Sequence, residues 1–213
     1  ESVTSIGILS FGGCSSLTSI AIPPSVTYIS NTAFQGCNNL TEMNLEGNKY
    51  YSFDNQTLFD KGKTELLCCL NIKVSEYTIP NTVKTIGEYA FCYDLKSITI
   101  PNSVTEIDSY AFVYWDKLTS VVLPESIDRI SKDAFYGCNN LVYNEYGNAY
   151  YLGSETNPYY TLVKVKSDDI TTCDIHKDCK VIAYNAFDNC NNLQYNEYDN
   201  ALYLGSNKNK YLM

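Results

Sequence analysis

Few residues in this chain could carry chemistry, and their spacing does not favour catalysis. The single histidine, His176, has no second histidine with which to share a metal ion, and the chain contains no H-E-x-x-H pattern. It also lacks G-x-S-x-G, G-x-G-x-x-G and phosphate-loop motifs. The sequence therefore predicts no catalytic residue, no metal site and no cofactor, and we expect His176 to be solvated or bonded locally.

The nine cysteines are the next candidates for chemistry, as disulfides or as thiols. Four of them recur at one place in a repeated pattern: Cys14, Cys37, Cys138 and Cys190. Equivalent positions of a repeat stack on one another, which predicts a ladder of small buried thiols. Cys173 and Cys179 lie outside it and are the one pair that could form a bridge. In the pair Cys68-Cys69, neighbouring strand residues face opposite sides, so we expect one buried and one exposed thiol.

Tyrosine is unusually frequent, with 20 residues, and tyrosine offers a large amphipathic contact area to protein or sugar ligands. Six tyrosines gather between residues 143 and 160, and four of these are candidate contact residues: Tyr150, Tyr151, Tyr159 and Tyr160. The alternative is that they wedge a hairpin against the body of the protein. The recurrence of Tyr143-Asn-Glu-Tyr146 as Tyr195-Asn-Glu-Tyr198 favours that alternative, because a structural repeat would keep such residues.

The charge balance limits the partners. The chain has 24 acidic and 15 basic residues, a formal net charge of -9. Nucleic acid and anionic membranes attract clustered cations, so neither is expected as a partner. No apolar run approaches the roughly 18 residues of a membrane helix, so we expect no membrane insertion by this segment. Because the chain begins and ends inside repeats, we expect a fragment of a longer protein.

These residues are positioned by a pattern that returns about every 23 residues. Val26-x-x-Ile29, Ala33-Phe34, Cys37 and Leu40-x-x-Met43-x-Leu45 reproduce the order of the first unit and recur in later ones. Such a period is typical of a solenoid, in which each coil packs only on its neighbours. We predict that the Leu-x-x-Ile-x-Ile segments stack as a parallel sheet. Ala-Phe should lie in a turn or 3₁₀ segment on the opposite wall, with the phenylalanine inside.

Several departures interrupt this rhythm. Residues 47–79 and 147–175 are predicted to be β-hairpin inserts, since strand-like runs flank turn sequences in each. Only four residues separate Phe91 from Leu95, where other units have six, so that coil should be tightened or bulged. Trp115 stands at the cysteine position, where an indole cannot fit unless the coil opens.

Alternation along the predicted strands identifies side chains that point away from the core. We predict that these residues line one face and form a candidate binding surface, as solenoids commonly bind on such faces. They are Glu42, Asn44, Glu46, Ser97, Thr99, Ser120 and Val122.

The repeat Leu-x-x-Ile-x-Ile-Pro-x-Ser-Val-x-x-Ile-x-x-x-Ala-Phe-x-x-Cys-x-x-Leu resembles the BspA-like, or treponemal-type, leucine-rich repeats. Residues 3–46, 80–141 and 176–193 carry the resemblance. It implies a mainly β, right-handed leucine-rich-repeat coil with hairpin inserts, forming a single domain over residues 1–213. It also implies a secreted or surface-attached protein, with adhesion to host proteins or other microbes. The family offers no binding motif to place on these residues.

Together these features predict a non-enzymatic protein-binding or adhesion module that acts outside the cell or at its surface. The expected partner is a host or microbial surface protein. Two alternatives stay open, namely a structural spacer that projects another domain, and a carbohydrate-binding surface built from exposed tyrosines.

Overall fold

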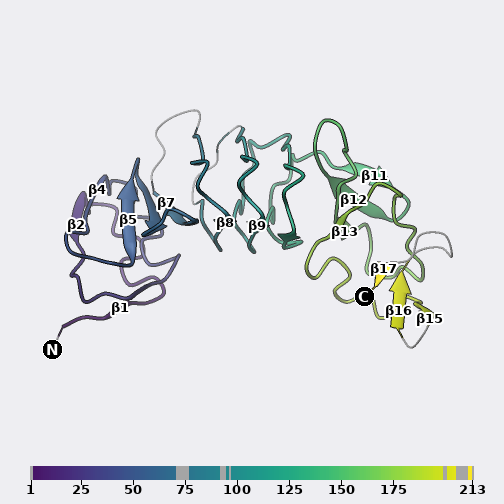
Figure 1. The fold of residues 1–213 in the computed structure, drawn as a ribbon, viewed down its shortest axis with the longest axis horizontal. Helices are drawn as coiled ribbons and strands as arrows, with labels where there is room; N and C mark the ends of the chain where they lie inside the picture. The colour runs from purple at the N-terminus through teal and green to yellow at the C-terminus, as the bar shows by residue number, and fades with distance from the viewer. Residues whose placement is uncertain are drawn as a thin grey trace.

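The protein is an elongated, mainly β solenoid of about seven turns (Figure 1). The computed structural model describes residues 2–70, 77–91, 95, 97–198, 201–204 and 211–212, and from residue 196 onward only the backbone of the strands. Within these residues there is no helix, and hence none that is long and apolar enough to cross a membrane. The predicted solenoid with hairpin inserts is confirmed.

The main parallel ladder is built from the Val-x-x-Ile segments. Its strands are β1 (Ser5–Ile6), β3 (Tyr28–Ile29), β8 (Thr85–Ile86), β9 (Glu106–Ile107), β10 (Arg129–Ile130) and β14 (Val181–Ile182). They fall into three hydrogen-bonded sheets: β1 with β3, then β8, β9 and β10 with the first insert, then β14 with the second insert. Equivalent isoleucines pair across coils, with Ile107 opposite both Ile86 and Ile130. These three side chains are fully buried, so the ladder turns one aliphatic residue per coil into the core.

The wall on which we predicted the parallel sheet is less regular. Only β2 (Ser19–Ala21) and β4 (Glu42–Asn44) pair there as strands, and a single bridge joins Thr78 to Thr99 further along the described chain. The prediction of a sheet along this whole wall is therefore wrong. One interruption is caused by an insert: Ile22 donates its backbone N–H to Asn44 in the next coil, whereas the equivalent Leu123 donates to Gly153 of the second insert.

The opposite wall carries the Ala-Phe segments in turns, and the described residues contain no 3₁₀ helix there. The phenylalanine rings stack from coil to coil: Phe112 lies 5.2 Å from Phe91 and 5.1 Å from Phe135, with the ring planes within 12° of parallel. This spacing is close to the separation of hydrogen-bonded strands, about 4.8 Å. The rings therefore follow the rise of the backbone from one coil to the next.

On the same wall, cysteines link a coil to the one before it. Cys37 and Cys138 are buried, and each thiol donates a hydrogen bond of 3.0 Å to the backbone carbonyl of a phenylalanine one coil earlier, Phe11 or Phe112. Cys190 is also buried, as predicted. Cys14 is exposed, contrary to the prediction, because the first described coil has a neighbouring coil on one side only.

Trp115 is buried at the cysteine position of the fourth unit. Its indole meets Phe91 and Phe112 edge-on, at centroid distances of 5.5 and 5.2 Å. Phe91 belongs to the unit with two residues fewer than the others, so the large ring packs beside the short coil. The predicted tightening of that coil concerns residues 92–94, which lie outside the described residues.

Both predicted inserts form β-hairpins. The first contains β5 (Tyr51–Asp54), β6 (Thr57–Asp60) and β7 (Glu65–Cys69), and the second contains β12 (Ala149–Leu152) and β13 (Thr161–Val165). A further strand, β11 (Asn144–Tyr146), pairs with β12 and begins before the predicted bounds of the second insert. A third set of strands near the C-terminus repeats the order: β15 (Asn196–Tyr198), β16 (Ala201–Leu204) and β17 (Tyr211–Leu212). In the first two inserts the last strand turns into the parallel ladder, with β7 pairing β8 and β13 pairing β14. Each of these inserts thus continues the stack.

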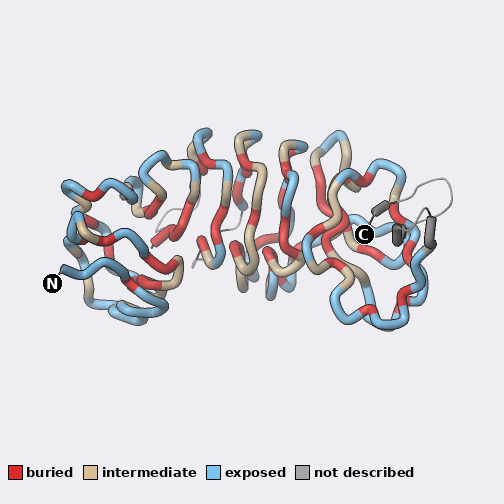
Figure 2. The backbone as a smooth tube through the Cα atoms, turned by 60° about the horizontal axis from the view of Figure 1, so that its bottom comes forward, coloured by how far each residue is buried: buried red, intermediate tan, exposed pale blue. Residues whose placement is uncertain are grey.

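The first hairpin also separates two hydrophobic cores, and buried segments run along the whole molecule on both sides of it (Figure 2). Leu67 and Cys68 face the N-terminal core, while Leu66 and Cys69 face the C-terminal one. A register shift in the β6–β7 pairing leaves Leu67 as the extra residue, which explains why it shares a side with Cys68. The expectation that one thiol of Cys68-Cys69 is exposed is therefore wrong, because both faces of this hairpin are covered.

The phenylalanine stack leads to a stability prediction. Phe112 lies between two other phenylalanines and has no exposed surface, so Phe112→Ala should lower the free energy of unfolding by about 3–5 kcal/mol. Urea denaturation followed by circular dichroism measures this. The exposed Val122→Ala is the control and should change stability by less than about 0.5 kcal/mol. A loss below about 1 kcal/mol for Phe112→Ala would show that the ring stack does not hold the coils together.

Candidate interaction surfaces

The seven predicted strand residues are all exposed. On β4, Glu42 and Asn44 point outward on either side of the buried Met43. Ser97 and Thr99 flank the buried Ile98 in the same way. Glu46 and Asn44 are further linked, since the Asn44 side-chain oxygen accepts a 2.9 Å hydrogen bond from the Glu46 backbone N–H.

These residues fall into two groups. Glu42, Asn44 and Glu46 belong to coils around the N-terminal core, and the remaining four belong to coils around the C-terminal core. The first hairpin stands between the two cores. The structure therefore gives two exposed patches of the predicted kind.

Two of the four predicted hairpin tyrosines have no surface to offer a ligand. Tyr151 is 0% exposed, and its hydroxyl accepts a 3.2 Å hydrogen bond from the backbone N–H of His176. Tyr160 is 9% exposed and donates a 2.6 Å hydrogen bond to the Glu125 carbonyl. The prediction that they are exposed contacts is wrong, because they hold the second insert against the adjoining coils, as the packing alternative proposed.

Tyr150 and Tyr159 are half-buried. Tyr159 stacks on His176 at a centroid distance of 4.0 Å, and Tyr146 meets the same imidazole edge-on at 4.9 Å. The Nδ1 atom of His176 accepts a hydrogen bond from the Asp178 backbone N–H. Local bonding of His176 is thus confirmed, and no group of three potential metal ligands occurs in the described part of the chain.

Lys164 lies over the aromatic faces of the second insert. Its ammonium is 4.8 Å from the ring centre of Tyr143 and 5.8 Å from that of Tyr150. Burial lowers the pKa of Lys164 and raises the pKa of the Tyr143 hydroxyl. Attraction to the ring faces partly offsets the loss of water around the ammonium.

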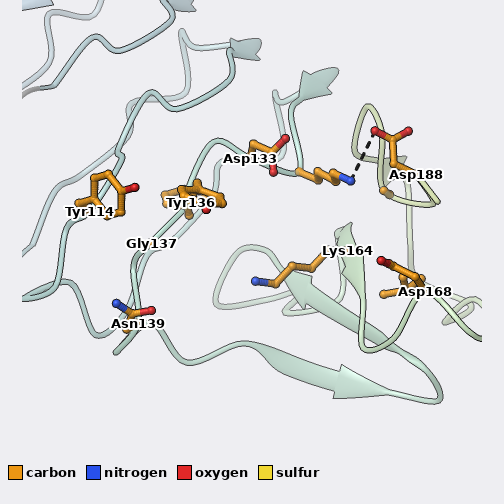
Figure 3. A pocket seen from close by; sticks show the side chains of 12 residues that line it. Tyr114, Asp133, Tyr136, Gly137, Asn139, Lys164, Asp168 and Asp188 are labelled. Carbon is orange, nitrogen blue, oxygen red and sulfur yellow. Dashed lines mark ion pairs between the residues drawn. The ribbon is translucent and has the colours of Figure 1, made fainter. Parts of the chain in front are cut away.

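A hollow of about 490 Å³ lies between the fifth coil and the second insert (Figure 3). Tyr114 and Tyr136 stand on one side of it, while Lys164 and Asp168 come from the other. An adjoining hollow of about 400 Å³ shares Lys164 and Asn139 with it. The sequence did not predict this site, because Tyr114 and Tyr136 come from turns of two coils and Lys164 comes from an insert. One available signal was that Tyr114 stands where most other units have glycine.

The fold and the repeat together define a leucine-rich-repeat solenoid. The family model described as "BspA type Leucine rich repeat region" matches in six copies over residues 1–68, 62–194 and 165–207. The chain belongs to this BspA-type leucine-rich-repeat family. No curated protein sequence matches it.

Two solved structures of low sequence identity share this fold with TM-scores above 0.5. A leucine rich cell surface protein from Faecalibacterium prausnitzii is 24% identical over 88% of this chain and 54% of its own, with a TM-score of 0.53. The pneumococcal vaccine antigen PcpA is 22% identical over 84% of this chain and 38% of its own, with a TM-score of 0.52. A leucine-rich repeat protein from Eubacterium ventriosum is 23% identical over 88% of this chain, with a TM-score of 0.48. The chain spans 64% of that protein, so it is shorter than all three.

The contrast between neighbouring tyrosines is testable. Tyr151→Ala removes a fully buried ring and should cost about 3–5 kcal/mol of unfolding free energy, as for other large aromatic truncations. Tyr150→Ala removes a half-buried ring and should cost less than about 1.5 kcal/mol. Chemical denaturation of both variants makes the comparison. Equal losses would contradict the assignment of Tyr151 to packing.

Proposed function

We propose that this chain is a non-enzymatic protein-binding module of a secreted or cell-surface protein, and that it binds through the exposed strand residues. The observation that carries the proposal is the alternation on this wall. Glu42, Asn44, Ser97 and Thr99 are exposed, while the residues between them are buried. The outward side chains are therefore fixed by a backbone that is anchored in the core.

Anchoring of this kind favours binding. A surface that is already ordered loses little conformational freedom when a partner docks, so more of the contact energy appears as affinity. Parallel pairing of Glu42 with Ser19, and of Asn44 with Ala21, holds these side chains at fixed separations in adjacent coils. The surface can thus present a fixed pattern of polar groups to a folded protein.

The location outside the cell is supported by the family and by relatives. A protein of similar fold from Faecalibacterium prausnitzii is described as a cell surface protein. The net charge of -9 also disfavours nucleic acid and anionic lipid as partners. The proposed partner is accordingly a host or microbial surface protein.

A structural spacer is the second candidate, and the elongated stack favours it (Figure 1). A spacer needs length and rigidity but no conserved contact surface. The two functions differ in whether the isolated array binds anything at all.

Binding to immobilised host matrix proteins, measured by surface plasmon resonance, tests the proposal. We expect saturable binding at micromolar concentrations that Glu42→Lys or Thr99→Lys weakens at least tenfold. Each change reverses or adds charge at an exposed strand position without touching the core. Tyr28→Lys, at an exposed position of β3 among the Val-x-x-Ile segments and not on this wall, should have no effect.

Enzymatic removal of glycans from the matrix proteins should leave unchanged the part of the binding that Glu42→Lys or Thr99→Lys weakens. No binding by the intact array would favour the spacer. Binding that survives both strand substitutions would place the contact surface elsewhere.

A further inference from the structure

We propose that the hollow beside Tyr114 and Tyr136 binds a neutral saccharide. This site is separate from the exposed strand residues, and the inference does not depend on them. It rests on the backbone of Tyr114, on the arrangement of the two rings and on the mixed charges of the lining.

Tyr114 occupies a backbone position that suits glycine. Its φ is 58°, and the corresponding residues of other units are Gly13, Gly36, Gly137 and Asn189, with φ between 67° and 79°. A bulky residue in this left-handed region is strained. The ring is 64% exposed, so packing against the core does little to offset the strain. Tyr89 and Tyr110 adopt a similar φ, so the backbone alone does not mark a site. Tyr114 differs from them in its exposed ring at the edge of the hollow.

The two tyrosine rings are held in place. The Tyr114 backbone N–H donates a 2.9 Å hydrogen bond to the Tyr136 carbonyl. The Tyr114 ring covers Gly137 so closely that an added methyl group there would overlap it. Tyr136, itself 50% exposed, meets Tyr114 edge-on at 5.8 Å and 75°. Two aromatic faces are thus presented at a fixed angle before any ligand arrives.

The polar groups around the hollow carry both charges (Figure 3). Carboxylates come from Asp133, Asp168 and Asp188, and ammonium groups come from Lys132 and Lys164. Lys132 pairs with Asp188 at 3.5 Å, whereas Lys164 makes no ion pair among the described residues.

This mixed lining does not favour a strongly charged ligand. An ion of either sign would meet like charges as well as opposite charges, so the lining gives an ionic ligand little net attraction. A neutral polyhydroxyl ligand can donate to the carboxylates and accept from Lys164, while the apolar face of its ring lies on a tyrosine. A sugar meets these conditions.

The dimensions and the composition support a sugar over a peptide. The volume of about 490 Å³ falls within the range of small-molecule sites, about 300–1,000 Å³. A peptide anchor needs a desolvated apolar pocket, but the apolar lining is limited to Phe135, Val165 and Ala186. The site is therefore better suited to a polar ligand that stacks at its rim.

A microarray of neutral and acidic oligosaccharides of defined structure, probed with the whole chain, tests the inference. We expect neutral glycans to bind, and Tyr114→Gly or Tyr136→Ala to reduce that signal at least tenfold. Tyr114→Gly should leave the Tm unchanged or raise it, because glycine adopts this φ without strain. Tyr28→Ala removes a tyrosine that is 55% exposed on β3 and should leave glycan binding intact.

The inference is overturned if no glycan binds, if only acidic glycans bind, or if both tyrosine variants bind as the unmodified chain does. Glu42→Lys should leave glycan binding unchanged. Since the glycans on the array carry no protein, failure here is distinct from failure of the proposed protein binding.

Discussion

Phenylalanine rings stack between neighbouring coils in two runs, Phe11 on Phe34 and Phe112 between Phe91 and Phe135, and the rest of the structure depends on this contact between neighbours. Phe91, Phe112 and Phe135 stack at 5.1–5.2 Å, close to the rise between paired strands. Because ring spacing and backbone spacing agree, the hydrogen bonds of the ladder and the packing of the core can form together. A coil of about 23 residues buries too little alone to offset its loss of conformational entropy, so its stability comes from its neighbours.

The first hairpin interrupts the regular coils, yet the hydrophobic packing continues on both of its faces. It lies between two cores and gives apolar side chains to both, with Leu67 and Cys68 on one side and Leu66 and Cys69 on the other. Its polar atoms are also satisfied, since the Thr57 hydroxyl lies 2.9 Å from the Tyr77 hydroxyl and 3.2 Å from the Cys69 sulfur. Burial raises the pKa of Tyr77, which keeps the phenol neutral inside the protein. The insert is thus a joint between two cores, and both groups of exposed strand residues depend on it for their relative position.

Much of this could be read from the sequence. The 23-residue period, the inward residues, the hairpins and three members of the buried cysteine ladder follow from local patterns, because spacing along the chain becomes stacking in space. The burial of Tyr151 and of both thiols in Cys68-Cys69 could not be predicted from the sequence. It depends on which coils cover the two faces of a hairpin. The hollow beside Tyr114 could not be predicted for a related reason. Lys164 and Tyr136 are brought together only when an insert folds against a coil.

We propose that the first hairpin couples the two cores into a single cooperative unit. Differential scanning calorimetry of the chain tests this most directly, because repeat arrays can lose cooperativity and unfold in parts. The account predicts one transition whose calorimetric and van't Hoff enthalpies agree. Two transitions, or a calorimetric enthalpy well above the van't Hoff value, would show that the cores unfold separately and would contradict it.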